Sequence, residues 1–440
     1  MTTERKQQAS ATFLFIFIVS ILFIGIVLDR TETQLLLISY SASFISYMFI
    51  ARSAAFPMWV FILIGIMVRI GLFGRLPSLS DDFYRFIWDG RLLVNGVNPY
   101  DIQPEKVLEL KLKGMGFEFY KNLNSPEYFT VYPPLNQFLF WISALLGMEG
   151  RVLASVNFLR IIILLSELGS IRLMYKIFNC NDQASRAITL YFLNPLVILE
   201  FCGNIHFEGI VLFFLLLAVY LFMKDSKWQG IALGLAAAVK LVPLLFLPPF
   251  ILLQWFRKGA WVSFCTLSTV TATFVPFLIT KGVGAAGMLS SLKLYYQSFE
   301  FNSSIYFLLK EIGIWAFGWN MISIIGPCLA FVVLLLIPSL AIYGRKNNMS
   351  LTTLLLFSLS IFLFMSTTVH PWYILILIPL GLISGFYYPI IWSFFIFFTY
   401  AGYDANGYQE PTFFIVFEYL AVYTFLMIEL LNKQRRFLNL

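Results

Sequence analysis

Charged residues are scarce in this 440-residue chain. Only 12% of its residues are Asp, Glu, Lys or Arg, whereas 60% are hydrophobic and 18% are aromatic. A soluble domain of ordinary composition carries about twice that charged fraction, so this composition excludes one. Apolar runs of about 15 to 25 residues are typical of bilayer-spanning helices, in which each backbone polar group is satisfied within its own segment.

Cysteine is also rare. The four cysteines include no C-x-x-C pair, so neither a zinc site nor a disulfide framework is indicated. The formal charge of +7 is not arranged as a basic stripe with interleaved aromatics, and we expect no nucleic-acid partner. Lys and Arg lie instead in short loops between the apolar runs, where they indicate membrane topology.

About fourteen apolar runs predict an all-α polytopic membrane protein with a single transmembrane domain over residues 1–440. The spans are expected at residues 12–28, 35–51, 57–73, 152–177, 187–201, 207–223, 229–241, 243–256, 260–280, 320–343, 350–367, 371–385, 387–402 and 412–431. The segments 229–241 and 243–256 are short, so a broken helix around Lys240 and Pro243 is an equal alternative.

The basic loops determine the predicted orientation. They can all lie in the cytoplasm only if the apolar stretch Pro133–Gly147 does not cross the bilayer. We therefore predict an extracytoplasmic loop over residues 74–150 with amphipathic, interfacial or re-entrant helices, and two cytoplasmic termini. Four polar patches then share the outer face: Gly74–Phe129, Gly203–Glu208, Lys281–Asn302 and Ser366–Tyr373.

Two adjacent carboxylates, Asp81 and Asp82, open a predicted helix just after the third apolar run. Such a pair can accept a proton from a substrate hydroxyl or hold a divalent cation such as Mg²⁺ or Mn²⁺, and the need for a cofactor stays open. The alternative is a helix cap at Asp81 or Asp82, with Asp89 paired locally to Arg85.

The stretch Ser80–Arg91 resembles the first-loop motif of GT-C glycosyltransferases, particularly the bacterial polyprenyl-phosphate-mannose-dependent mannosyltransferases and the related GPI mannosyltransferases. Later segments resemble further parts of that pattern in the same order, over roughly residues 57 to 375. They are Thr130–Leu135 with Tyr132, Asn194-Pro195, Gly203–Glu208, Ala238–Pro243, Phe301–Ser304 and Val369–Tyr373.

The resemblance implies a GT-C-like helix bundle in the bacterial cytoplasmic membrane. It implies inverting transfer of a hexose, with mannose as the first candidate, from a polyprenyl-phosphate donor to an extracytoplasmic glycan, lipid or protein acceptor. The catalytic base maps best to Asp82, with Asp81 adjacent. Tyr132 and Asn302 fall on family segments and are expected to contact substrate.

Lys240 is the expected partner of the donor phosphate. An ammonium at membrane depth is costly unless an anion or a watery cavity compensates it, although snorkelling to the interface is the alternative. Arg85 and Arg91 are expected to assist, and a solvated or ion-paired arginine is the alternative for both.

Both histidines lie in the outer patches. His206 and Glu208, two residues apart, are expected to bind sugar or orient the acceptor, and a polar cap is the alternative; two residues make an incomplete metal site, so no zinc is expected. His370, with Trp372 and Tyr373, is expected to contact lipid phosphate or a sugar face rather than serve only as an interfacial aromatic belt.

Two intramembrane charges, Arg160 and Glu167, either pair with each other or face the bundle interior. The competing function is a lipid-linked sugar transporter or flippase, which also needs many spans and intramembrane charge. A transporter is expected to have matched halves, and the sequence contains no internal repeat.

Overall fold

The computed structural model describes residues 3–53, 56–148, 150–278, 285–404 and 407–438. These residues are mostly helical, and they form two compact units, each described by itself. The first unit comprises Met1–Gly71, Met174–Glu200 and Phe299–Leu440. The second unit comprises Leu72–Leu173 and Phe201–Ser298.

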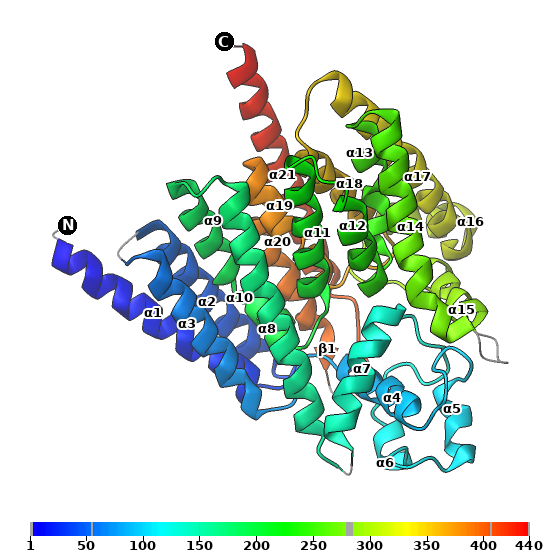
Figure 1. Cartoon of the computed structure of the whole chain (residues 1–440). Helices are drawn as coiled ribbons and strands as arrows, with labels where there is room; N and C mark the ends of the chain where they lie inside the picture. Colours follow the sequence, from blue (N-terminus) through cyan, green and yellow to red (C-terminus); the bar gives the residue numbers. More distant parts are fainter. Residues whose placement is uncertain (1–2, 54–55, 149, 279–284, 405–406, 439–440) are drawn as a thin grey trace. The chain divides into compact units, whose positions relative to one another are not determined.

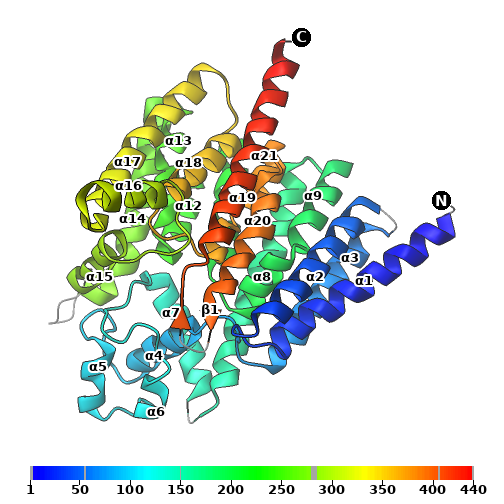
Figure 2. The same cartoon turned by 180° about the vertical axis from the view of Figure 1, so that it is seen from behind.

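Helices dominate the first unit. Its helices are α1 (Thr3–Ile26), α2 (Thr33–Ser53), α3 (Met58–Gly71), α9 (Asp182–Phe192), α10 (Pro195–Ile198), α16 (Ile305–Phe317), α17 (Ile322–Lys346), α18 (Leu351–Met365), η5 (Pro371–Ile374), α19 (Leu377–Ser384), α20 (Tyr388–Phe395), η6 (Ile396–Gly402) and α21 (Thr412–Leu438). Helices α1 and α2 pack together, as do α17 and α18 and also α20 and α21 (Figures 1 and 2). The prediction of an all-helical fold did not include the short antiparallel pair β1 (Tyr403–Asp404) and β2 (Gly407–Tyr408).

The second unit also consists of helices. They are η1 (Leu72–Gly74), α4 (Asp82–Val94), α5 (Pro104–Val107), η2 (Leu108–Leu110), α6 (Phe117–Tyr120), α7 (Pro134–Gly147), α8 (Val152–Ile177), whose last turn belongs to the first unit, α11 (Glu208–Met223), α12 (Gln229–Val239), η4 (Val242–Phe246), α13 (Leu247–Leu252), α14 (Phe256–Leu278) and α15 (Ala285–Gln297). A π-helical turn, η3 (Leu199–Gly203), leads from the first unit into α11.

Among the described residues, six helices are long and apolar enough to cross a bilayer, which indicates a membrane protein. The bent pair formed by Asp182–Phe192 and Pro195–Gly203, with a 58° angle, would be a seventh span. The fourteen predicted runs coincide largely with helices, but several of these helices have only 10 to 17 residues, so the predicted number of spans stays a prediction. The six are Gln7–Ile26, Thr33–Ser53, Val152–Ile177, Phe256–Leu278, Ile322–Lys346 and Thr412–Lys433.

Helices α11, α12 and α14 pack side by side in the second unit (Figure 1). Small residues on α12 permit this approach: a Cβ at Gly230 would lie 2.6 Å from the carbonyl oxygen of Val262, and one at Gly234 would lie 2.9 Å from that of Thr266. Helix α12 ends at Val239, and the backbone of Lys240 is extended, with φ −144° and ψ 140°. Pro243 lacks an N–H and lies in the first turn of η4, so the break predicted around Lys240 is confirmed.

The predicted long loop contains α4 to α7, which cluster at one end of α12 and α14 (Figure 1). Trp88 of α4 forms a small core with Leu92, Val107 and Met115. Helix α7 begins with Pro134 at its first turn, and its 14 residues span about 21 Å, shorter than a bilayer core. This length suits the predicted interfacial or re-entrant helix, and the orientation of α7 stays a prediction.

Candidate functional site

Asp82 is the first residue of α4, and its carboxylate contacts the side chains of Asn124 and His206. Its Oδ1 accepts a hydrogen bond of 2.6 Å from Nδ2 of Asn124. Its Oδ2 lies 3.6 Å from Nε2 of His206, which is close enough for an ion pair when the imidazole is protonated but long for a hydrogen bond. The Asp82 side chain is 19% exposed, so it is held by neighbours and can still reach a substrate.

Asp81 occupies the N-cap position of α4 but makes no side-chain capping hydrogen bond. The backbone N–H of Asp82 donates a hydrogen bond of 3.3 Å to the hydroxyl oxygen of Ser80. The Asp81 carboxylate therefore does not act as the helix cap that was one alternative to a chemical role. The contacts distinguish the two acids, because His206 is an ion-pair partner of Asp82.

His206 lies at the entrance to α11 and is 2% exposed. The residue before it, Ile205, has φ 65° in the left-handed region, which is costly for a β-branched side chain. The residue after it, Phe207, packs its ring against Phe86 of α4 and Phe140 of α7, with centroids 5.1 and 5.3 Å apart. This packing anchors the turn that carries the imidazole.

Glu208 begins α11, where the helix dipole favours a negative charge. Its carboxylate forms an ion pair with the ammonium of Lys240, just past the end of α12. Glu208 is 3% exposed and Lys240 is 22% exposed. The carboxylate supplies the anion that an ammonium at this depth requires, so Lys240 is compensated within the protein itself.

The end of α12 is also held from α7. Nδ2 of Asn136 donates a hydrogen bond of 3.0 Å to the carbonyl oxygen of Val239, the residue before Lys240. Asn136 itself is fully buried. The segment that carries Lys240 is thus tied to the same small helix that supports Phe207.

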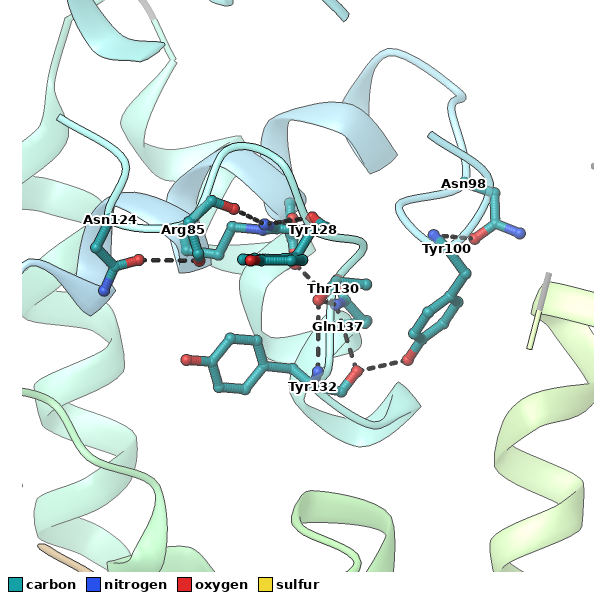
Figure 3. Close-up of polar contacts among 10 residues, drawn as sticks. Arg85, Asn98, Tyr100, Asn124, Tyr128, Thr130, Tyr132 and Gln137 are labelled. Atoms are coloured by element: carbon teal, nitrogen blue, oxygen red, sulfur yellow. Dashed lines mark hydrogen bonds and ion pairs between the residues drawn. The ribbon is translucent and has the colours of Figure 1, made fainter. Parts of the chain in front are cut away.

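Arg85 is buried and contributes to the loop structure (Figure 3). Its Nε donates to Oδ1 of Asp89 at 2.8 Å, which confirms the predicted local pair, and its Nη1 donates to the carbonyl oxygens of Ser125 and Tyr128 at 3.2 and 3.0 Å. Nε2 of Gln137 donates to the other Asp89 oxygen at 3.0 Å. Arg85 therefore holds the loop segment that follows Asn124.

Arg91 is likewise buried, and burial lowers the pKa of its guanidinium. Its Nη1 donates to the carbonyl oxygen of Gly114 at 2.7 Å, and the guanidinium lies 4.5 Å from the ring centroid of Phe119. These contacts connect α4 with α6. Both predicted phosphate-binding arginines are thus engaged by the loop, and their contact with substrate stays a prediction.

Tyr132 packs its ring against Phe86 and Phe140, with centroids 5.0 and 5.5 Å apart. Its carbonyl oxygen accepts a hydrogen bond of 2.6 Å from the hydroxyl of Tyr100 (Figure 3). Burial, together with the charge of Asp89, raises the pKa of Tyr100 well above its ordinary value, so its phenol remains a donor at neutral pH. Tyr132 therefore belongs to one aromatic cluster with Phe86, Phe140 and Phe207, the residue after His206.

The other predicted binding residues lie in the first unit. The imidazole of His370 stacks on Trp372 with centroids 4.4 Å apart, and Tyr373 meets it edge-on at 5.3 Å. Phe301 lies 4.4 Å from the His370 ring, and the fully buried Asn302 follows it. Nδ2 of Asn302 donates to Glu418 at 3.1 Å, so its amide holds α21 in place.

The described residues contain no group of three or more His, Cys, Asp or Glu side chains arranged to hold a metal ion.

The chain matches the family model described as alpha-(1->6)-mannopyranosyltransferase, N-terminal domain, over residues 30–257. This match covers just over half of the 440 residues. The chain belongs to the alpha-(1->6)-mannopyranosyltransferase family. The matched region of this mannosyltransferase contains Asp82, His206, Glu208 and Lys240, and ends before Asn302. No curated protein matches the chain.

Three polar residues near the candidate site of this mannosyltransferase were not predicted from the sequence: Asn124, Asn136 and Gln137. Asn124 lies in an irregular polar loop, where nothing in its neighbourhood distinguishes it. Asn136 and Gln137 carried a usable signal, because two adjacent amides in the otherwise apolar stretch Pro133–Gly147 are expected to find buried partners. The resemblance singled out Tyr132 in this region and passed over both amides.

Proposed function

We propose that this protein transfers mannose, with inversion, from a polyprenyl-phosphate donor to an acceptor hydroxyl on the outer face of the bacterial cytoplasmic membrane. The observation that carries the proposal is the line of contacts in the second unit. Asp82 lies between Asn124 and His206, and Glu208, two residues after His206, pairs with Lys240. An acid, an imidazole and an ammonium thus come from three separate segments of the chain.

Asp82 is the proposed general base. Its Oδ2 accepts the proton of the acceptor hydroxyl, whose oxygen attacks the anomeric carbon of the donor mannose. The bond from that carbon to the phosphate oxygen breaks, and polyprenyl phosphate leaves with the bonding electrons. Inversion that ends in an α linkage requires a β-linked donor. The alpha-(1->6) linkage in the description of the family makes a sugar 6-hydroxyl the acceptor group to test first.

Asn124 and His206 support the assignment of Asp82 over Asp81. The Asn124 amide donates to Oδ1 of Asp82, and we propose that Oδ2, on the side of His206, takes the incoming proton. The nearby imidazole can stabilise the carboxylate when it is protonated. We expect Glu208 and His206 to contact the sugar hydroxyls.

Lys240 is the proposed contact of the departing phosphate. A leaving group that carries its own charge needs a cation or oriented dipoles nearby. Arg85 and Arg91 already donate to Asp89 and to backbone carbonyls, whereas the Lys240 side chain is partly exposed at the break after α12. Glu208 holds this ammonium in position without covering it.

The opposite end of α11 supports the proposed membrane orientation. That helix has 16 residues, about 24 Å in length, and its far end carries a basic group consisting of Lys224, Lys227, Arg257 and Lys258. Basic residues favour the cytoplasmic side, which supports the proposal that Glu208 and the Asp82 loop lie outside. Both termini are proposed to be cytoplasmic.

The direct test incubates the purified full-length protein with polyprenyl-phosphate mannose and a mannoside that offers a free 6-hydroxyl. We expect transfer by the wild type and a loss of kcat of about 100-fold or more in Asp82→Asn, because the general base is removed. Asp81→Asn is expected to retain most activity. Asp101→Asn, in the same loop, is the matched control.

Undiminished transfer by both Asp82→Asn and Asp81→Asn would remove the proposed base. Loss confined to Asp81→Asn would move the role to its neighbour. A transporter or flippase is the competing function: it predicts movement of labelled donor lipid across a vesicle bilayer with no glycosylated product.

A further inference from the structure

Arg160, in the middle of α8, contacts both segments that lead to the candidate site. Its Nε donates a hydrogen bond of 2.6 Å to the carbonyl oxygen of Cys202, and its Nη2 donates one of 3.0 Å to that of Gly203. Its Nη1 donates one of 2.6 Å to the carbonyl oxygen of Arg75. The first two acceptors lie just before His206, and the third lies in the segment that leads to Asp82.

We propose that Arg160 is a positioning residue that holds the His206 turn beside Asp82. The catalytic role of Arg160 rests on the function proposed above, whereas its hydrogen bonds do not depend on that function. The guanidinium is 1% exposed and is satisfied mainly by backbone carbonyls, which is an unusual use of a buried charge. Neither partner segment can shift without breaking at least one of these hydrogen bonds.

The backbone at this point needs such support. The π-helical turn η3 widens the helix up to Gly203, and Ile205 then adopts a left-handed φ of 65°. Conformations of this kind are strained and persist only where surrounding contacts over-determine them. The two hydrogen bonds to Cys202 and Gly203 are contacts of that kind, immediately upstream of the strained residue.

The predicted Arg160–Glu167 pair is replaced by a different arrangement. Both residues are buried, which agrees with the alternative expectation that they face the bundle interior. Arg160 donates to backbone carbonyls, and the Glu167 carboxylate accepts a hydrogen bond from the thiol of Cys202 at 3.7 Å. Nη1 of Arg160 also contacts Oδ1 of Asn157 at 3.3 Å. A guanidinium can donate hydrogen bonds to three carbonyl oxygens at once because its N–H donors form a rigid planar fork. The N–H donors of a lysine ammonium diverge from a single atom and do not reproduce this geometry.

The test compares wild type with Arg160→Lys in the full-length protein, using diethyl pyrocarbonate to modify histidine. The chain has only two histidines, so mass spectrometry resolves His206, with His370 as the internal reference. We expect several-fold faster modification of His206 in the variant, because the imidazole leaves its buried position. Transfer should lose about 10- to 100-fold in kcat with little change in KM for the donor.

Arg69→Lys is the matched control, since Arg69 is also fully buried and donates to a backbone carbonyl, that of Gly65 in the first unit. An unchanged rate for His206 in Arg160→Lys, or an equal rise in Arg69→Lys, would overturn the assignment. Should Arg160→Lys not fold, Arg160→Gln retains an amide donor and is judged by the same rates. The modification assay needs no substrate, so failure of the proposed transfer is a separate result.

Discussion

The ion pair between Glu208 and Lys240 yields a quantitative prediction. Replacing Lys240 with methionine keeps the length of the side chain but leaves the Glu208 carboxylate, 3% exposed, without its ammonium. The second carboxylate oxygen, Oε2, has no hydrogen-bond partner among the described residues. Breaking a buried pair from one side costs about 3 to 5 kcal/mol, and we expect the lower end because Lys240 is partly exposed.

A double-mutant cycle separates the interaction energy between Glu208 and Lys240 from the contribution of each residue alone. Glu208→Gln should cost less than Lys240→Met, because the exposed part of the lysine lets its head move toward water. The double variant should recover much of the loss, since neither charge then remains alone. An interaction energy on the order of 1 to 3 kcal/mol is expected, because the two side chains touch.

Thermal unfolding of the purified protein in detergent, followed by tryptophan fluorescence, measures these differences. Lys258→Met is the control: its partner Asp225 lies at 2.5 Å, but the two side chains are 50% and 71% exposed. A surface pair of this kind contributes about 0 to 1 kcal/mol. Strictly additive losses in the Glu208 and Lys240 variants, or no loss in Lys240→Met, would refute the reasoning.

Two further predictions concern packing and pH. A Cβ at Gly90 would lie 2.1 Å from the carbonyl oxygen of Phe140, so Gly90→Ala should force α4 from α7 and lower stability by about 1 to 3 kcal/mol. Gly116→Ala, with nothing within 4 Å, should leave the melting temperature unchanged, and equal melting temperatures for both variants would contradict the packing. Burial tends to raise the pKa of Glu300, but hydrogen bonds led by Lys310 outweigh it, so the pKa lies below its ordinary 4.5. The stability that Glu300 contributes is therefore present above pH 4.5 and lost as the pH falls through the lower folded value. The melting temperature of Glu300→Gln should fall less steeply in acid, and an identical slope would contradict this.

The apolar pattern alone determined where most helices lie. The run predicted at 152–177 coincides with α8, and the break after α12 follows from Pro243, whose ring and missing N–H are local properties. Resemblance of short motifs pointed to the mannosyltransferase family and to its acidic loop. These features are encoded within a few neighbouring residues, so a single sequence suffices to read them.

Only the tertiary structure decided which polar groups meet. Asn124 reaches Asp82 across 42 positions in the chain, and Lys240 meets Glu208 across 32. Lys240 was expected to meet the donor phosphate, and its pair with Glu208 was not predicted, because sequence spacing does not reveal contacts between helices. Arg85 and Arg91 looked available for phosphate for the same reason. Which donor finds which acceptor depends on how α4, α7, α11 and α12 pack, and side-chain geometry at that distance is set by the folded backbone.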